Sequence, residues 1–387
     1  MQASPKVSVI IVTHNNSDLT FNCVEAVVEN TKNCSYEIIV VDNGSVQNEA
    51  QKLVEASNCG FTLISLNRNL FFGEANNIAA EHANGECILF LNNDVRVTSG
   101  WLEQLVTTLE IEAFAGAVGP KFLYPNGTLQ EAGAYIRSDG WTLQVGKYGV
   151  NFPPTYTDTT QVVDYCSAAC LLLKRQSFLN IGGFDPIFDP AYFEDVDLAL
   201  RLRSIGLFTY FCGQVAVYHE ENRTSQQLWS NEQLRNHMVV NHKKFYGRWG
   251  DYLRRRLSED CEPEPLSPLE WQPESRLNNR ATAVLFCSSP IRSCENSRRL
   301  LLVASALEES HSVIIAADEI FSRCRVYSLC REFNIQLTSF QIRNISQIEA
   351  CEGQIVIAFE GVPSNQCLGP HITFEHARCT LLERLEI

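Results

Sequence analysis

Residues 7–13 read VSVIIVT, and this near-continuous apolar run decides the class of fold. A strand that is covered on both faces loses the alternation of polar and apolar side chains, so the run predicts a buried strand of a parallel sheet. Strands and helices in alternation predict an α/β domain with an open, mostly parallel sheet. Further strand patterns lie at residues 37–41 (EIIVV), 61–66 and 87–91 (CILFL), and helical patterns lie at residues 17–29 and 73–83.

Polar clusters follow three of the apolar runs, at the point where each predicted strand ends. They are Thr13-His14-Asn15, Asp42-Asn43 and Asn92-Asn93-Asp94. In an open parallel sheet, ligands bind beyond the carboxyl ends of the strands. The three clusters therefore predict a ligand site at one edge of the sheet.

Residues 192–198 read YFEDVDL and place three carboxylates within otherwise apolar sequence. The plainer interpretation is an acidic first turn of a helix, because negative charge there complements the helix dipole. The alternative is a functional site, because carboxylates that lie close together repel each other and suit a proton acceptor or a metal site. The residues alone leave both interpretations open.

Single residues give weaker signals. Asp94 at a strand end could hold Mg²⁺ or Mn²⁺, which prefer oxygen ligands, although Asn-Asn-Asp is also an ordinary turn. Asp42 could accept hydrogen bonds from a base or ribose, or could simply form the turn of DNGS. His219 could bind the metal, although a lone histidine is more often structural.

Composition excludes some classes of protein. The chain has 387 residues, enough for two domains, and its formal net charge of −14 argues against a nucleic-acid partner, which needs a basic face. Its 15 cysteines include no CxxC pair, so free thiols in a reducing cytosol are the simplest interpretation. No secretory signal and no apolar run of about 20 residues is visible. We therefore expect a cytoplasmic protein.

A change of composition predicts the domain organisation. Residues 258–280 are rich in proline and acidic residues, which is typical of an extended linker. Strand patterns then recur at residues 283–287, 313–317 and 354–359, with an amphipathic helix at about 297–308. We therefore predict a first domain at 1–257 and a small α/β domain at 281–387, which we interpret as a partial Rossmann-like (half GT-B) module.

Taken together, the motifs are far more specific than each one alone. VSVIIVTHNN, EIIVVDNGS, NRNLFFGEANN, ILFLNNDV and GGFDPIFDPAYFEDVDLALRLRSIG resemble, in order and spacing, the family 2 glycosyltransferases with a GT-A fold. Within that family the chain resembles the rhamnosyltransferase-like branch that builds surface polysaccharides. The resemblance covers residues 6–250, about two thirds of the chain.

The resemblance implies roles for particular residues. Asp195 would be the catalytic base, with Glu194 beside it raising its pKa by charge repulsion. Asp94 would bind a divalent cation, Mg²⁺ or Mn²⁺, and the donor diphosphate, with Asn92 and Asn93 in place of the usual acids, and His219 would be a second metal ligand. The remaining substrate-binding residues would be Thr13, Asn15, Asp42, Arg68 and Asn76. Ser167-Ala168-Ala169 departs from the Thr-Gly that the family often has before the next strand.

The implied function is an inverting transfer of a sugar from a dTDP- or UDP-linked donor to a hydroxyl of a glycan or lipid-linked acceptor. Such a transfer needs the leaving diphosphate stabilised by a cation and the acceptor hydroxyl deprotonated by a carboxylate. One base and no nucleophile give a single displacement with inversion. The alternatives are a sugar-nucleotide-binding regulator with weakened catalysis, and a nucleotidyltransferase, although the Gly-rich basic loop of the latter is missing after Thr13.

A basic, aromatic-rich run lies between His242 and Arg256 and stands out on an acidic chain. One hypothesis places this run on the anionic inner face of the plasma membrane, with its aromatic rings at the headgroups. The alternative is that the aromatic side chains pack onto the domain and the charges form a solvated face. The residues concerned are Lys243, Lys244, Phe245, Tyr246, Arg248, Trp249, Tyr252 and Arg254-Arg255-Arg256.

Overall fold

The chain forms two compact units, Met1–Pro268 and Leu269–Ile387. The computed structural model describes residues 5–57, 60–147, 154–220 and 228–258, and beyond these the five strands β13–β17 together with residues 300–302, 304–305 and 326. The predicted linker at 258–280 lies outside the described residues apart from Ser258. The domain boundaries therefore stay a prediction.

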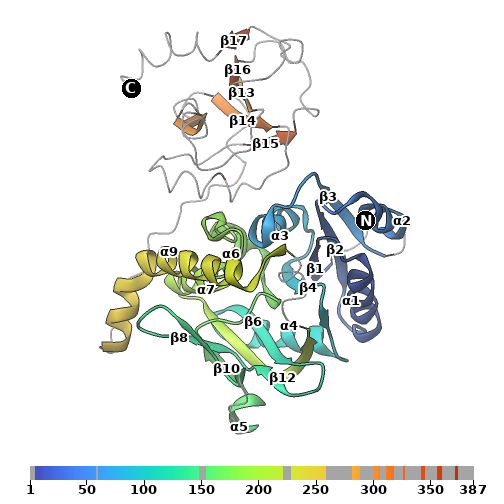
Figure 1. The fold of residues 1–387 in the computed structure, drawn as a ribbon, viewed down its shortest axis with the longest axis vertical. Coiled ribbons are helices and arrows are strands. Elements are labelled where there is room, and N and C mark those ends of the chain that lie inside the picture. The colour runs from blue at the N-terminus through green and yellow to red at the C-terminus, as the bar shows by residue number, and fades with distance from the viewer. Residues whose placement is uncertain are drawn as a thin grey trace. The chain divides into compact units, whose positions relative to one another are not determined.

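The first unit alternates strands and helices along the chain, as predicted (Figure 1). Its strands are β1 (Val7–Thr13), β2 (Tyr36–Asn43), β3 (Thr62–Leu66), β4 (Cys87–Asn92), β5 (Val95–Arg96), β6 (Ala115–Leu123), β7 (Leu129–Glu131), β8 (Ala134–Ile136), β9 (Thr142–Gln144), β10 (Thr160–Val163), β11 (Cys170–Lys174) and β12 (Phe208–His219). Its helices are α1 (Ser17–Asn30), α2 (Gln47–Ala56), α3 (Phe71–His82), α4 (Trp101–Ile111), α5 (Pro154–Thr157), α6 (Arg175–Asn180), the 3₁₀ turn η3 (Pro186–Phe188), α7 (Glu194–Ser204) and α9 (Asn231–Ser258).

The main sheet has the strand order β10-β12-β6-β11-β4-β1-β2-β3. The four strands β3, β2, β1 and β4 are parallel, β11 runs antiparallel between β4 and β6, and β6 is parallel to β12. The register places Thr13 beside Asp42 and Val12 beside Asn92. The carboxyl ends of β1, β2 and β4 therefore meet at one edge, as the polar clusters predicted.

Helices cover both faces of this sheet (Figure 1). Successive residues of β1 belong to different cores: Ile10 packs on one face, and Val9 and Ile11 pack on the other. The face of Val9 and Ile11 is covered by α1, α2 and α4, and the face of Ile10 by α3, α6 and α7. Fully burying such a side chain contributes about 1.5–3 kcal/mol, which explains why β1 is mostly apolar on both faces.

The second unit contains a five-stranded sheet of order β15-β14-β13-β16-β17 in which every pair of neighbours is parallel. Counted along the chain this order is 3-2-1-4-5, the doubly wound Rossmann order. The predicted strands correspond to β13 (Ala281–Cys287), β14 (His311–Ala317) and β16 (Ile355–Phe359). The sequence missed β15 (Gln341–Asn344) and β17 (His371–Thr373), which are short and carry little apolar signal.

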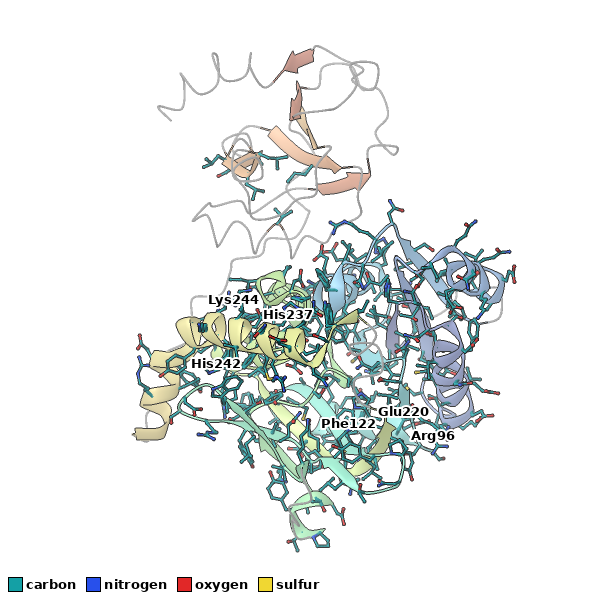
Figure 2. All side chains as sticks on the ribbon, viewed as in Figure 1. Arg96, Phe122, Glu220, His237, His242 and Lys244 are labelled. Atoms are coloured by element: carbon teal, nitrogen blue, oxygen red, sulfur yellow. The ribbon has the colours of Figure 1, made fainter. Side chains whose placement is uncertain are left out.

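The basic, aromatic-rich run forms most of α9, and its main aromatic side chains are buried. Phe245 is 0% and Trp249 is 5% exposed, and both pack against α7. Lys244 donates to the carbonyl oxygen of Ile187 (2.6 Å; Lys244 is labelled in Figure 2). The hypothesis that these rings reach lipid headgroups is therefore wrong for Phe245 and Trp249, because they contribute to a core instead. Within the described residues, no helix is both long and apolar enough to cross a membrane.

Candidate active site

A cavity of about 630 Å³ opens at the carboxyl edge of the main sheet. This volume suits a small-molecule ligand. Its wall combines polar strand ends with aromatic rings from the loops. Seven of the predicted site residues line it, namely Thr13, Asn92, Asn93, Asp94, Glu194, Asp195 and His219.

The Glu194–Asp195 pair opens α7 at this wall, after a strained turn. Tyr192 and Phe193 precede it with φ of 73° and 76°, although neither is glycine. Such strain costs on the order of 1–3 kcal/mol per residue and persists only where the surroundings hold it. Here the side-chain amide of Asn241, from α9, donates to the carbonyl oxygens of Ala191 (2.8 Å) and Tyr192 (3.2 Å). The helix α9 therefore supports the turn that places both carboxyls in the cavity wall.

Hydrogen bonds distinguish the two carboxyls. Asp195 accepts the backbone N–H groups of Ala168 (3.3 Å) and Val196 (2.8 Å), whereas Glu194 Oε2 is buried without a hydrogen-bond partner. Burial raises the pKa of Asp195, and burial together with the charge of Asp195 raises the pKa of Glu194 well above its usual range. Both carboxyls therefore bind a proton more readily than exposed carboxyls do.

From the sequence, Glu194 was expected to raise the pKa of Asp195 by charge repulsion. In the structure, burial is the largest cause of the raised pKa at both carboxyls, and the charge of Asp195 adds to it at Glu194. Backbone N–H groups oppose the shift at both carboxyls, because they stabilise the charged forms. The roles of the two carboxyls stay a prediction.

Asp94 and His219 face each other across the cavity edge. Asp94 Oδ1 lies 3.3 Å from His219 Nε2 and is buried without a hydrogen bond. The other ring nitrogen, Nδ1, lies 3.0 Å from the side-chain oxygen of Gln130 in β7 and donates to it. The amide oxygen can only accept, so Nδ1 carries the hydrogen of this bond, and Nε2 is the ring nitrogen that faces Asp94. The ring of His219 is further fixed by Phe122, at 5.6 Å between ring centroids (Phe122 is labelled in Figure 2).

Asn93 lines the cavity, but its side chain is engaged within the fold. Its amide donates to the hydroxyls of Thr13 (3.2 Å) and Thr20 (3.3 Å). Asn92 joins β4 to the neighbouring segment, with its N–H donating to the carbonyl of Ala169 (2.8 Å). Asp94 supplies the one carboxylate of the triplet Asn92-Asn93-Asp94, and the side-chain amide of Asn93 is already engaged.

Four other predicted residues are not part of the cavity lining. Asp42 is 3% exposed and accepts the N–H of Ser45 (2.9 Å), which is the turn interpretation of DNGS. Asn15 accepts the N–H of Val46 (2.7 Å), and Asn76 donates to the carbonyl of Phe72 within its own helix (2.9 Å). Arg68 is exposed. Their substrate-binding roles stay a prediction.

The turn at Gly44, which the sequence did not identify as functional, brings the side-chain amides of Asn43 and Asn69 to the cavity wall. Gly44 has φ of +72°, and a Cβ there would come within 2.3 Å of the backbone of Arg68. This close approach lets the Asn43 amide donate to Asn69 Oδ1 (3.1 Å), and both side chains line the cavity.

The sequence also missed Glu131, the last residue of β7. It is 4% exposed and accepts the N–H of Ser167 (3.3 Å) and the side-chain amide of Gln144 (2.8 Å). Ser167 and Ala168 therefore use successive N–H groups to hold two carboxyls, Glu131 and Asp195. The only sequence signal was a single acid among apolar neighbours, which is too common to interpret.

The burial of Glu131 predicts a pH effect on stability. Burial raises its pKa from 4.5 to about 7. The folded state then binds the proton more tightly, so this contribution to stability is complete below pH 4.5 and is lost as the pH rises through about 7. Glu131→Gln, which carries no charge at any pH, is expected to gain up to about 3 kcal/mol of unfolding free energy over wild type between about pH 5 and about pH 8.

Denaturant unfolding at the two pH values measures this gain. Glu29→Gln, at an exposed position of α1, is the control and should follow wild type. Parallel curves for Glu131→Gln and wild type would contradict the raised pKa.

Comparisons with known proteins agree with this geometry. Residues 8–182 match the family described as Glycosyl transferase family 2. The chain is 32% identical over 230 residues to the O-antigen biosynthesis protein RfbC of Myxococcus xanthus, a match that covers 57% of this chain and 18% of that protein. It is 26% identical over 231 residues to the N-acetylglucosaminyl-diphospho-decaprenol L-rhamnosyltransferase of Mycobacterium tuberculosis, covering 54% of this chain and 73% of that one. The chain thus spans only a small part of RfbC.

A solved structure shares the fold. The crystal structure of GalNAc-T7 with UDP, GalNAc and Mn²⁺ superposes with a TM-score of 0.52 at 16% identity, covering 66% of this chain and 50% of that chain. A likeness at this level of identity shows the fold, and the fold class predicted from the sequence is confirmed.

Proposed function

We propose that this chain, whose residues 8–182 match the family described as Glycosyl transferase family 2, is an inverting glycosyltransferase of surface polysaccharide synthesis. It would move a sugar from a nucleoside diphosphate, dTDP- or UDP-linked, to a hydroxyl of a glycan or lipid-linked acceptor. One observation carries the proposal: the buried, hydrogen-bonded carboxyl of Asp195 and the facing pair Asp94 and His219 line the same cavity. The names of the O-antigen and rhamnosyltransferase relatives support the biological setting.

The proposed reaction is a single displacement. Asp195 accepts the proton of the acceptor hydroxyl as that oxygen attacks the anomeric carbon and the nucleoside diphosphate leaves. The raised pKa of Glu194 favours its neutral form, which carries no charge beside the base. Attack opposite to the leaving group inverts the anomeric configuration.

The residues at the sheet edge fit a divalent cation, Mg²⁺ or Mn²⁺. Asp94 Oδ1 is buried without a hydrogen bond, and His219 Nε2 lies 3.3 Å from it, so that one cation could contact both atoms. Oxygen and imidazole ligands suit Mn²⁺, and two protein ligands leave positions for diphosphate oxygens and water. The cation would act as a Lewis acid on the leaving diphosphate. Lys147 is the one Lys or Arg among the described residues of the lining, so few other positive charges are available there.

A substitution of Gln130 tests the cation site indirectly, because Gln130 contacts His219 rather than the proposed cation. Gln130→Leu removes the acceptor that orients His219, and such changes typically cost about 10–100-fold in metal affinity. We expect a loss of this size in Mn²⁺ affinity, measured by calorimetry in the presence of nucleoside diphosphate, together with weaker nucleotide binding after chelation. Gln214→Leu, at an exposed position of the same strand as His219, is the control. Unchanged nucleotide binding in EDTA would argue against any metal.

A donor screen tests the activity itself. The full chain would be incubated with UDP-, dTDP- and GDP-linked sugars, and release of the nucleoside diphosphate would be measured with and without added saccharide acceptors. Turnover of at least one donor is expected. Binding of a nucleotide sugar without any turnover would instead support the alternative, a catalytically weakened regulator, for which the single carboxylate of the Asn92-Asn93-Asp94 triplet is the specific argument.

We place the proposed activity in the cytoplasm. Six cysteines of the first unit have free thiols, which suits a reducing compartment. A lipid-linked acceptor would bring the enzyme to the inner face of the membrane. The relative named for a diphospho-decaprenol acceptor supports that association.

A further inference from the structure

Trp141 lies in the cavity wall, and neither the catalytic roles nor the cation account for it. This residue immediately precedes β9, and its side chain is half-buried. The indole stacks on His242 of α9, with ring centroids 4.1 Å apart and planes inclined by 6° (His242 is labelled in Figure 2). The ring of Phe193 meets it edge-on at 6.1 Å. One face of Trp141 is therefore covered by protein, while the ring still borders the cavity.

The structure also fixes the hairpin that carries Trp141. His242 Nε2 donates to the carbonyl of Asp139 at the tip of the β8–β9 hairpin (2.8 Å). Gly140 has φ of +80°, and a Cβ there would come within 2.8 Å of the ring of Tyr246. A side chain at this point would push the hairpin away from α9. The tryptophan is thus preorganised, and little ordering cost remains to be met when a ligand stacks on it.

The residues around Trp141 place it on the side of the cavity where Asp195 lies, rather than on the side of Asp94 and His219. Phe193 immediately precedes the Glu194–Asp195 pair. Next to Trp141, Thr142 hydrogen-bonds Tyr165, whose pKa is raised well above its ordinary value by burial and by the charges of Glu131 and Asp195. Other strands and loops of the lining carry two further pairs, the hydrogen-bonded amides of Asn43 and Asn69 and the facing Asp94 and His219.

We propose that Trp141 is the stacking platform of the acceptor subsite, and that the acceptor presents a pyranose ring to Asp195. This inference rests on the proposed function. A flat indole offers dispersion contact and a negative π face to the C–H groups of a pyranose, while Thr142 and Gln144 in the same lining can hydrogen-bond its hydroxyls. An acyclic alcohol or a bare lipid phosphate would gain nothing from such a face.

Two variants of similar side-chain size test the platform. Trp141→Phe keeps a flat ring and the packing on His242, whereas Trp141→Leu keeps apolar volume without a flat face. Binding of methyl β-pyranosides to the full chain would be followed by saturation-transfer NMR on the ring protons. We expect binding to persist in wild type and Trp141→Phe, and to weaken by about 10–100-fold in Trp141→Leu, as for loss of an aromatic anchor. Leu143→Ala is the control, because Leu143 is 57% exposed and is not in the cavity lining.

The outcomes separate this inference from the proposed function. Equal binding to wild type and Trp141→Leu, or no transfer of saturation to any pyranoside ring in wild type, would overturn the platform. If Trp141→Leu instead lowered the affinity for the nucleotide, the platform would also be overturned, because Trp141 would then belong to the donor subsite. Failure of the function would appear elsewhere, as absence of nucleoside diphosphate release in the donor screen.

Discussion

Replacing Asp195 by Asn is expected to lower the rate of sugar transfer by about 10²–10⁴-fold, the usual effect of losing a general base. Asparagine can still accept the N–H of Ala168, which Asp195 accepts at 3.3 Å, but it cannot take the proton of the acceptor hydroxyl. Donor affinity should stay close to that of wild type, because Asp94 and His219 are untouched. Steady-state transfer and donor calorimetry on the same preparations measure the two quantities.

Glu194→Gln is the matched test of which carboxyl is the base. Burial and the charge of Asp195 raise the pKa of Glu194 and so favour its neutral form, which a neutral amide of the same length replaces closely. We expect a loss of transfer of less than about tenfold, well below that of a missing base. If Glu194→Gln is the more damaging change, the two roles are reversed. If both variants turn over normally, neither residue is the base.

Local patterns predicted the first unit well because its strands are buried by ordinary hydrophobic packing. The expected strand at residues 7–13 is β1, and the expected strand at 87–91 differs from β4 by one residue. Such runs carry their own signal, since burial on both faces demands apolar side chains throughout. β15 and β17 were not predicted, because strands of four and three residues are too short to show the alternation of polar and apolar side chains.

The candidate site was only partly predictable, because half of its geometry depends on contacts between distant segments. Asp94, Asp195 and His219 could be named from motifs, whereas Gln130 acquires its role only when β7 lies 3.0 Å from His219. Trp141 becomes a wall of the cavity only because His242, about a hundred residues later, stacks on it. No pattern within either segment contains that information.

Side chains on α9 show why a charge run is a weak predictor. Arg248 and Trp249 looked like part of a basic, aromatic surface. The structure shows Arg248 donating to both Asp185 (2.9 Å) and Asp197 (2.7 Å), and the indole of Trp249 donating to Asp197 (2.9 Å). The sequence does not reveal that the partners of these groups are acids in the segment before α7 and in α7 itself.

Asp197, the third acid of the YFEDVDL stretch, is the centre of this network and carries the second large prediction. It is 0% exposed and also accepts Arg201 Nε at 2.7 Å. Its pKa is lowered although burial opposes this, because Arg201 and Arg248 stabilise its charge. Its contribution to stability is therefore present at neutral pH and is lost as the pH falls through its folded-state pKa.

Asp197→Ala is expected to lower the unfolding free energy of the first unit by about 3–5 kcal/mol at neutral pH, because it leaves two guanidinium groups without their shared carboxylate. Tryptophan fluorescence in denaturant reports this unit, since Trp101, Trp141, Trp229 and Trp249 lie within it. Asp251→Ala is the control: Asp251 pairs with Arg254 on the surface of α9 and is 86% exposed, and such pairs contribute about 0–1 kcal/mol. The network also ties α7 to α9, and α9 holds the strained turn before Glu194. Asp197→Ala should therefore slow transfer as well, even at temperatures where the variant stays folded. A loss of stability below about 1 kcal/mol would show that the two arginines find other partners, and that α7 does not depend on this carboxylate.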